Sequence, residues 1–148
     1  MKIHKIEVAR RQLDTAIDLF FSSGDPCSVI ALAAASEEIL GQYMDGEWAE
    51  DNQNNMFSLM YESARERGFE FKSKAEFSQK LVNRTKNSLK HASSKEEQFV
   101  SFNEEEMVIR LMCAIFNFQL GAGRPFSDAM SRFEAWLKDQ RPQYLGPV

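Results

Sequence analysis

Cysteines, histidines and long apolar runs are scarce in this sequence of 148 residues, and these scarcities exclude several classes of protein. The only cysteines, Cys27 and Cys113, lie far apart in apolar surroundings, so they form neither a disulfide framework nor a zinc knuckle and are expected to be small core residues. No apolar run approaches the ~20 residues of a membrane-spanning helix. The segment from Met1 to Glu7 lacks the apolar stretch of a secretory signal. These absences predict a cytoplasmic protein that does not associate with membranes.

Positive charge is not in excess either. The net charge of -4 at pH 7 excludes the broad basic surface of a protein that coats nucleic acid nonspecifically, although it leaves room for a local basic site. The sequence also lacks a phosphate-binding loop, a Gly-x-Ser-x-Gly element and a dinucleotide-binding fingerprint. The enzyme classes that depend on these motifs are therefore excluded, and we expect no cofactor.

A metal centre is not expected, although several helical positions carry carboxylates. Helical bundles that hold two metal ions use a Glu-x-x-His spacing on two helices, and this spacing does not occur here. The only histidines are His4 and His91. We therefore interpret the glutamates as surface residues and as partners of positive helix N-termini. They are Glu37, Glu38, Glu104, Glu105 and Glu106.

What the sequence does have is helical periodicity. Apolar residues recur at three- and four-residue spacing, as in Ile6, Ala9 and Leu13, and no stretch alternates with the period of two that a half-buried strand requires. Helices are predicted at about residues 4–22, 26–44, 55–67, 74–91, 104–120 and 128–138. We expect one all-α domain over residues 1–148, an antiparallel helical bundle of five to six helices with a tail at 139–148.

Residues that start and stop helices fall at these boundaries. Gly24 is expected to end the first helix and Asp25 to cap the second, which begins at Pro26 because a missing N–H costs nothing there. The segment Ser73-Lys74-Ala75-Glu76 has the spacing of a capping box. Asn103 precedes three glutamates that complement the positive end of the helix they open.

The segment predicted at 74–91 carries one polar face. Arg84 precedes His91 by seven residues, which at ~100° per residue falls ~20° short of two full turns, so both share a face with Asn87. Lys86 and Lys90 add positive charge beside it. An imidazole that titrates near neutral pH can transfer a proton, and a guanidinium can bind the charge that builds on a phosphate. The set therefore suits attack on a phosphodiester, for which RNA supplies its own 2′-OH nucleophile.

This segment also resembles a known family. Arg84, six intervening residues and His91 resemble the mark of the HEPN superfamily, helical bundles that share an arginine, four to six residues and a histidine near the end of a late helix. The two long N-terminal helices with a tight turn at Gly24 and Asp25 look like uncharacterised bacterial proteins that also carry an Asn-x-x-Lys-His element, which is Asn87 to His91 here. The resemblance covers about residues 8–120.

The resemblance implies a metal-independent ribonuclease that is active when two copies juxtapose their motifs. Arg84 and His91 would be the catalytic pair, and the residues that bind RNA beside them would be Lys86, Asn87 and Lys90. A homodimer is also expected because Phe116 and Phe118 cannot both point to one side of their helix, and a helix that is apolar on two faces usually has neighbours on both.

A second interpretation keeps the fold and removes the catalysis. Thr85 follows the arginine at a position where the family's nucleases usually have asparagine, aspartate or histidine. Together with the acidic balance, this favours a noncatalytic helical interaction module, a binder of a small ligand or nucleotide, or the partner of another protein. In that case Arg84 and His91 shape a polar pocket, or His91 and Lys90 serve only the negative end of their helix. A purely structural accessory protein is the third alternative.

Overall fold

The chain is all-α throughout the part that the computed structural model describes, which comprises residues 1–43, 61–62, 65–66, 70, 72–77, 99 and 102–142. Its helices are α1 (Lys5–Phe21), α2 (Pro26–Gly41), α4 (Lys74–Phe77), α6 (Glu104–Gly121) and α7 (Asp128–Gln140). The all-α part of the predicted fold class is confirmed, since these described ranges contain no strand, whereas the count of five to six helices stays a prediction. None of the helices in them has the length and apolar character needed to cross a membrane.

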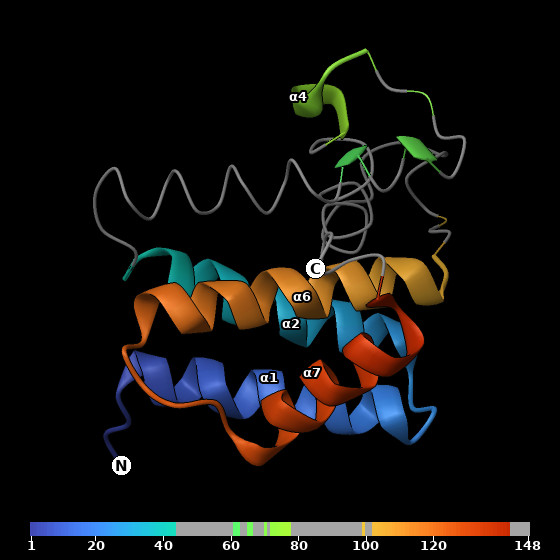
Figure 1. Cartoon of the computed structure of the whole chain (residues 1–148). Helices are drawn as coiled ribbons and strands as arrows, with labels where there is room; N and C mark the ends of the chain where they lie inside the picture. Colours follow the sequence, from blue (N-terminus) through green and yellow to red (C-terminus); the bar gives the residue numbers. More distant parts are fainter. Residues whose placement is uncertain are drawn as a thin grey trace.

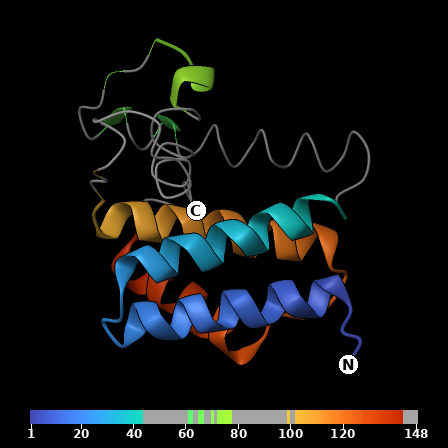
Figure 2. The same ribbon diagram turned by 180° about the vertical axis from the view of Figure 1, so that it is seen from behind.

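The helices α1, α2, α6 and α7 pack around one core. Figure 1 shows α1 and α2 as an antiparallel pair, with α6 lying along α2 and antiparallel to α1. The view from behind shows the same layers (Figure 2). The helices α2 and α6 run in the same direction (Figure 1). Accordingly, Asn117 near the end of α6 donates a hydrogen bond to the carbonyl of Glu37 near the end of α2. The end of α2 and the start of α6 therefore lie at opposite ends of this pair.

Apolar stripes on the four helices form the core. On α1 the predicted stripe is buried, and Leu13, Ala16 and Ile17 have no exposed surface. A buried hydrogen bond from Ser36 Oγ to the carbonyl of Ala9, 2.9 Å long, fixes α2 against it. The core cluster comprises Ile6, Ala9, Leu13, Ala16, Ile17, Val29, Ala33, Leu40, Val108, Leu111, Ala114, Ile115, Phe118, Met130, Phe133 and Leu137. Most of its members come from the three- and four-residue spacing that predicted the helices.

The turn between α1 and α2 differs from its prediction in one respect. The residue in the left-handed region is Ser23, with φ 56°, and not Gly24. The N–H of Gly24 donates to the carbonyl of Leu19 at 2.7 Å and that of Ser23 to Phe20 at 3.4 Å, the two bonds of a Schellman ending. Gly24 follows the left-handed position. A glycine is needed there because the side chain of Leu19 packs against its backbone, and a Cβ at this position would lie 2.7 Å from Leu19 Cδ2.

The predicted helix starts are confirmed where the structure describes them. Asp25 caps α2, accepting from the N–H of Ser28 at 2.9 Å, with Pro26 in the first turn. Contacts with the hydroxyl and N–H of Ser28 lower the pKa of this carboxyl. Asn103 and Glu106 form a reciprocal capping box at the start of α6.

Helix lengths differ from their predictions by a few residues. The helix α2 ends at Gly41, three residues before the predicted limit, and α7 continues to Gln140, two residues into the predicted tail. At α4, Ser73 accepts from the N–H of Glu76, whose carboxylate reaches the N–H of Lys72. Most of the helices predicted at 55–67 and 74–91 lies outside the described residues, as does the tail beyond 142.

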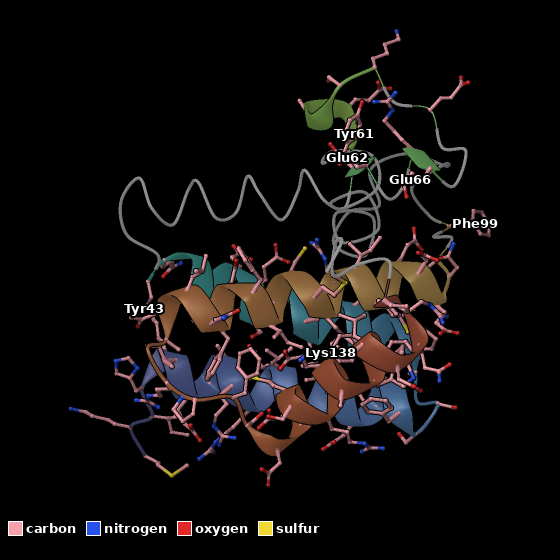
Figure 3. The ribbon with its side chains drawn as sticks, in the orientation of Figure 1. Tyr43, Tyr61, Glu62, Glu66, Phe99 and Lys138 are labelled. Carbon is pink, nitrogen blue, oxygen red and sulfur yellow. The ribbon has the colours of Figure 1, made fainter. Side chains whose placement is uncertain are left out.

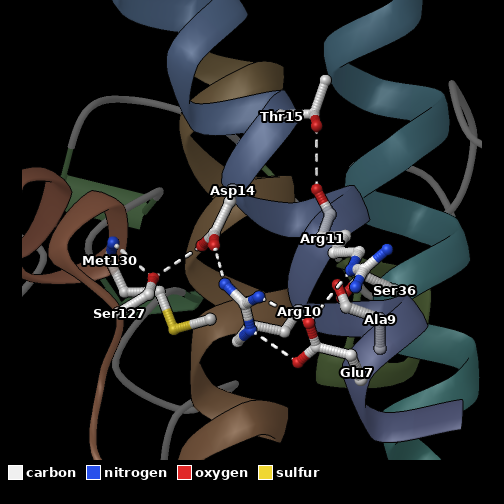
Figure 4. Close-up of polar contacts among 9 residues, drawn as sticks. All are labelled: Glu7, Ala9, Arg10, Arg11, Asp14, Thr15, Ser36, Ser127 and Met130. Carbon is white, nitrogen blue, oxygen red and sulfur yellow. Dashed lines mark hydrogen bonds and ion pairs between the residues drawn. The ribbon is translucent and has the colours of Figure 1, made fainter. Parts of the chain in front are cut away.

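A chain of charged contacts on α1 joins the start of α7 to the bundle (Figure 4). Arg10 binds both carboxylate oxygens of Glu7, at 2.8 and 2.6 Å, and also contacts Asp14 at 2.6 Å. The other oxygen of Asp14 accepts a hydrogen bond from Ser127 Oγ at 2.6 Å. Ser127 in turn caps α7 by accepting from the N–H of Met130. The cap of α7 and the charged face of α1 therefore form one network.

The ionisation of Glu7 is expected to support the folded state in acid. Hydrogen bonds from Arg10, and then from Arg11, lower the pKa of Glu7 from 4.5 to about 2. A carboxyl whose pKa is depressed on folding stabilises the protein above its ordinary pKa and loses this contribution as the pH falls through the folded value. In thermal melts from pH 7 to pH 2, wild type should therefore exceed Glu7→Gln in Tm at neutral pH and converge on it between about pH 4.5 and pH 2. A Tm difference that is the same at every pH would contradict this assignment.

Candidate functional site

The five residues of the predicted RNA site fall outside the described residues. They are Arg84, Lys86, Asn87, Lys90 and His91. In sequence they lie between α2 and α6, the two parallel helices of the core. Two other features of the described helices have the burial and chemistry of functional sites, and both involve residues that come together only in the folded chain.

The first feature is a buried ion pair between α2 and α6. Arg110 is 2% exposed in the middle of α6, and its Nη1 lies 3.1 Å from Oε2 of Glu37, whose side chain is 16% exposed. Although these two atoms are close, the terminal nitrogens of Arg110 do not have the geometry of a hydrogen bond. Asn117, about two turns further along α6 on nearly the same face, donates to the carbonyl of Glu37 at 3.1 Å. The interpretation of Glu37 as a surface carboxylate is therefore wrong, because the carboxylate of Glu37 pairs with the buried guanidinium of Arg110.

The second feature is a pocket of about 400 Å³ where the end of α1 meets the starts of α2 and α6. This volume lies within the ~300–1,000 Å³ typical of small-molecule sites. Three half-buried aromatic side chains, Phe20, Phe21 and Trp136, form its apolar walls together with Met107. The turn residues Ser23, Gly24 and Pro26 and the carboxylate Glu104 also line it.

The aromatic walls meet nearly at right angles. The ring centroids of Phe20 and Trp136 are 5.1 Å apart with planes at 78°, and those of Phe21 and Trp136 are 6.1 Å apart at 81°. Phe20 and Phe21 are themselves edge to face, at 5.4 Å and 72°. Phe133, 1% exposed, supports this cluster from the core side and stacks on Trp136 at 5.6 Å. Edge-to-face pairs of this kind hold rings in fixed orientations.

Charged groups surround the pocket, and one of them lines it. Glu104, which opens α6, binds Arg141 at 3.0 Å. The guanidinium of Arg141 lies 5.4 Å from the centre of the Trp136 ring, and that of Arg132 lies 4.1 Å from the centre of Phe21. Neither arginine lines the pocket, in which Glu104 is the charged residue.

Two further expectations concern the cysteines and the dimer. Cys113 is buried, in agreement with its prediction as a small core residue, whereas Cys27 is only half-buried. Phe118 is fully buried in the core whereas Phe116 is half-buried, so the two do point to different surroundings. Phe99 is 83% exposed and projects away from the helices (Figure 3). The homodimer itself stays a prediction.

Comparisons with protein-family models, with curated proteins and with solved structures found no match for this chain. Sequence reasoning also missed the pocket, because its walls come from separate helices that are far apart in the sequence. A signal was present in the adjacent pair Phe20 and Phe21 at the end of α1. Neighbouring residues on a helix point about 100° apart, and both of these large side chains are only half-buried.

Proposed function

We propose that the protein is a HEPN-like bundle of five to six helices that binds and cleaves RNA as a homodimer. The observation that carries this proposal is the sequence spacing of Arg84, six residues and His91, with Asn87 on the same face of the predicted helix. The described helices support its context in two ways. The α1–α2 pair has the tight Gly-Asp turn that belongs to the resemblance, and every helix of the core packs as expected for an all-α bundle.

The chemistry follows from the residue types. His91 in its neutral form accepts the proton of a ribose 2′-OH, whose oxygen attacks the adjacent phosphorus and expels the 5′-oxygen, which leaves a cyclic phosphate and a 5′-hydroxyl. Arg84 binds the phosphate oxygens on which charge builds. Lys86, Asn87 and Lys90 hold the neighbouring backbone. The leaving oxygen needs a proton as the nucleophile loses one, and a second His91 from a dimer partner supplies it.

The test is RNA cleavage in EDTA by wild type, Arg84→Ala and His91→Ala. Removing a group that transfers a proton typically lowers a rate by roughly 10²–10⁴-fold, so we expect both variants to lose nearly all cleavage and to keep their size by light scattering and their helical circular dichroism. The matched control is His4→Asn, which changes the other histidine and retains a side chain able to cap α1. Its cleavage rate should equal that of wild type.

The noncatalytic alternative is favoured by Thr85 and by the aromatic pocket, which has the size of a ligand site. Under this alternative, wild type and both variants would be equally inactive on RNA. Binding of labelled RNA, measured for the same three proteins, separates the outcomes further. Weaker binding by Arg84→Ala without any cleavage by wild type would indicate an RNA-binding module, whereas the absence of both activities would overturn the RNA proposal.

A further inference from the structure

We propose that the pocket between α1, α2, α6 and α7 binds a small organic cation of the quaternary ammonium class. Its described lining includes none of the residues that the RNA proposal uses, and the proposal does not depend on that one. The proposal rests on the aromatic walls, on the positions of two guanidinium groups and on the charge of the pocket lining.

The walls have the arrangement that recognises a cation without a directed hydrogen bond. The faces of aromatic rings carry negative potential and attract ammonium groups placed within about 6 Å, with tryptophan the strongest of the three ring types. Phe20, Phe21 and Trp136 stand almost perpendicular to one another, at 72°, 78° and 81°. A round trimethylammonium group can contact several such walls at once, whereas a flat ligand can stack on only one of them.

The protein already places cations on two of these rings. Arg132 lies 4.1 Å from the centre of Phe21, and Arg141 lies 5.4 Å from the centre of Trp136. Both distances fall within the range of attractive cation–π contact. The aromatic cluster therefore accepts positive charge, and Phe20, Phe21 and Trp136 also line the pocket.

The charge of the lining selects a cation over an anion. The starts of α2 and α6 both lie at the pocket, and bare helix N-termini would favour an anion. Here, however, the carboxylate of Asp25 caps the start of α2, and Glu104 to Glu106 form the first turn of α6. An anion would consequently meet Glu104 inside the pocket, whereas a cation would share this carboxylate with Arg141, which binds one of its oxygens at 3.0 Å.

The quaternary class follows from size and hydration. Glu104 is one carboxylate with a side chain 56% exposed, too few acceptors to replace the water around a primary ammonium with its three N–H donors. A quaternary ammonium has no N–H group and sheds its water more easily. The volume of about 400 Å³ also leaves room for the substituent on a trimethylammonium group. The hydroxyl of Ser23 lines the pocket and provides a polar contact for that substituent.

The experiment is a calorimetric titration of the full-length protein with choline and with its uncharged carbon isostere, dimethylbutanol. We expect choline to bind roughly tenfold or more tightly than the alcohol, and Trp136→Leu and Glu104→Gln each to weaken choline binding severalfold. Trp136→Phe, which keeps an aromatic wall, should retain more affinity than Trp136→Leu. Glu134→Gln is the matched control, because Glu134 is a carboxylate of α7 that does not line the pocket.

Each outcome decides the proposal. Equal affinity for choline and the alcohol would show that the pocket selects shape and not charge, and would overturn the proposal. The absence of choline binding at about 20 mM would overturn it as well. Loss of affinity in the Glu134→Gln control as large as in Glu104→Gln would also overturn it. The double variant Arg84→Ala, His91→Ala should bind choline as wild type does. Failure of RNA cleavage and failure of choline binding are therefore distinguishable.

Discussion

Replacing Glu37 with glutamine should lower the free energy of unfolding by roughly 3–5 kcal/mol, the range found when one partner of a buried ion pair is removed. The reason is that Arg110 has 2% exposure and would keep its charge after losing Glu37, its ion-pair partner among the described residues. Arg110→Met should cost less, because the side chain of Glu37 is 16% exposed and water can solvate it once the arginine is gone. Urea denaturation followed by circular dichroism measures all three proteins.

Two further variants isolate the electrostatic origin of this loss. In the double variant Glu37→Leu, Arg110→Met both charges are absent, and stability should return to near the wild-type value because apolar pairs often replace buried ion pairs without loss. The matched control is Glu134→Gln, which breaks an exposed i,i+4 pair with Lys138 at 3.0 Å. It should change the free energy by no more than about 0.5 kcal/mol. A loss in the double variant as large as in Glu37→Gln would show that shape, and not charge, governs this contact.

Replacing Phe133 with alanine should cost roughly 3–5 kcal/mol, as for other fully buried phenylalanines. Phe133 is 1% exposed and contacts three aromatic rings, with centroid distances of 5.7 Å to Phe20, 6.4 Å to Phe21 and 5.6 Å to Trp136. Its removal leaves a cavity behind the pocket walls, so choline affinity should fall together with stability. Urea denaturation gives the first quantity and calorimetric titration the second.

The control for Phe133 is an exposed phenylalanine. Phe99 is 83% exposed, and Phe99→Ala should change stability by no more than about 0.5 kcal/mol. Phe133→Leu, which fills part of the cavity, should lie between wild type and Phe133→Ala. If Phe133→Ala unfolded at nearly the wild-type urea concentration, then the aromatic cluster would contribute little to the core, and the fixed geometry of the pocket would lose its physical basis.

Local rules predicted the helices well because the determining residues are close together in sequence. Asp25, Asn103 and Ser127 each cap a helix within three residues of their own position. The turn at Ser23 shows where a local rule fell short. Glycine is the usual left-handed residue at a helix end, but here serine takes that conformation, and the glycine is required one residue later by the approach of Leu19.

The two candidate features of the described helices depend on distant partners and were not predictable in this way. Arg110 and Glu37 are 73 positions apart, and nothing in either neighbourhood marks them as a pair. The pocket likewise needs Phe20 from the end of α1, Glu104 from the start of α6 and Trp136 from α7. By contrast, the predicted face of Arg84, Asn87 and His91 involves residues of one short segment, so helical periodicity alone is enough to propose it.

The parallel arrangement of α2 and α6 has a consequence for how the chain acquires its structure. The α1–α2 hairpin is joined by a short turn, so its contacts are local and carry a small entropic cost of closure. The contacts of α6 with α2 must close the long intervening segment before they form, and such non-local contacts slow folding. We therefore expect the hairpin to form early and α6 to dock late, so that Glu37 of α2 stays exposed to water until Arg110 arrives.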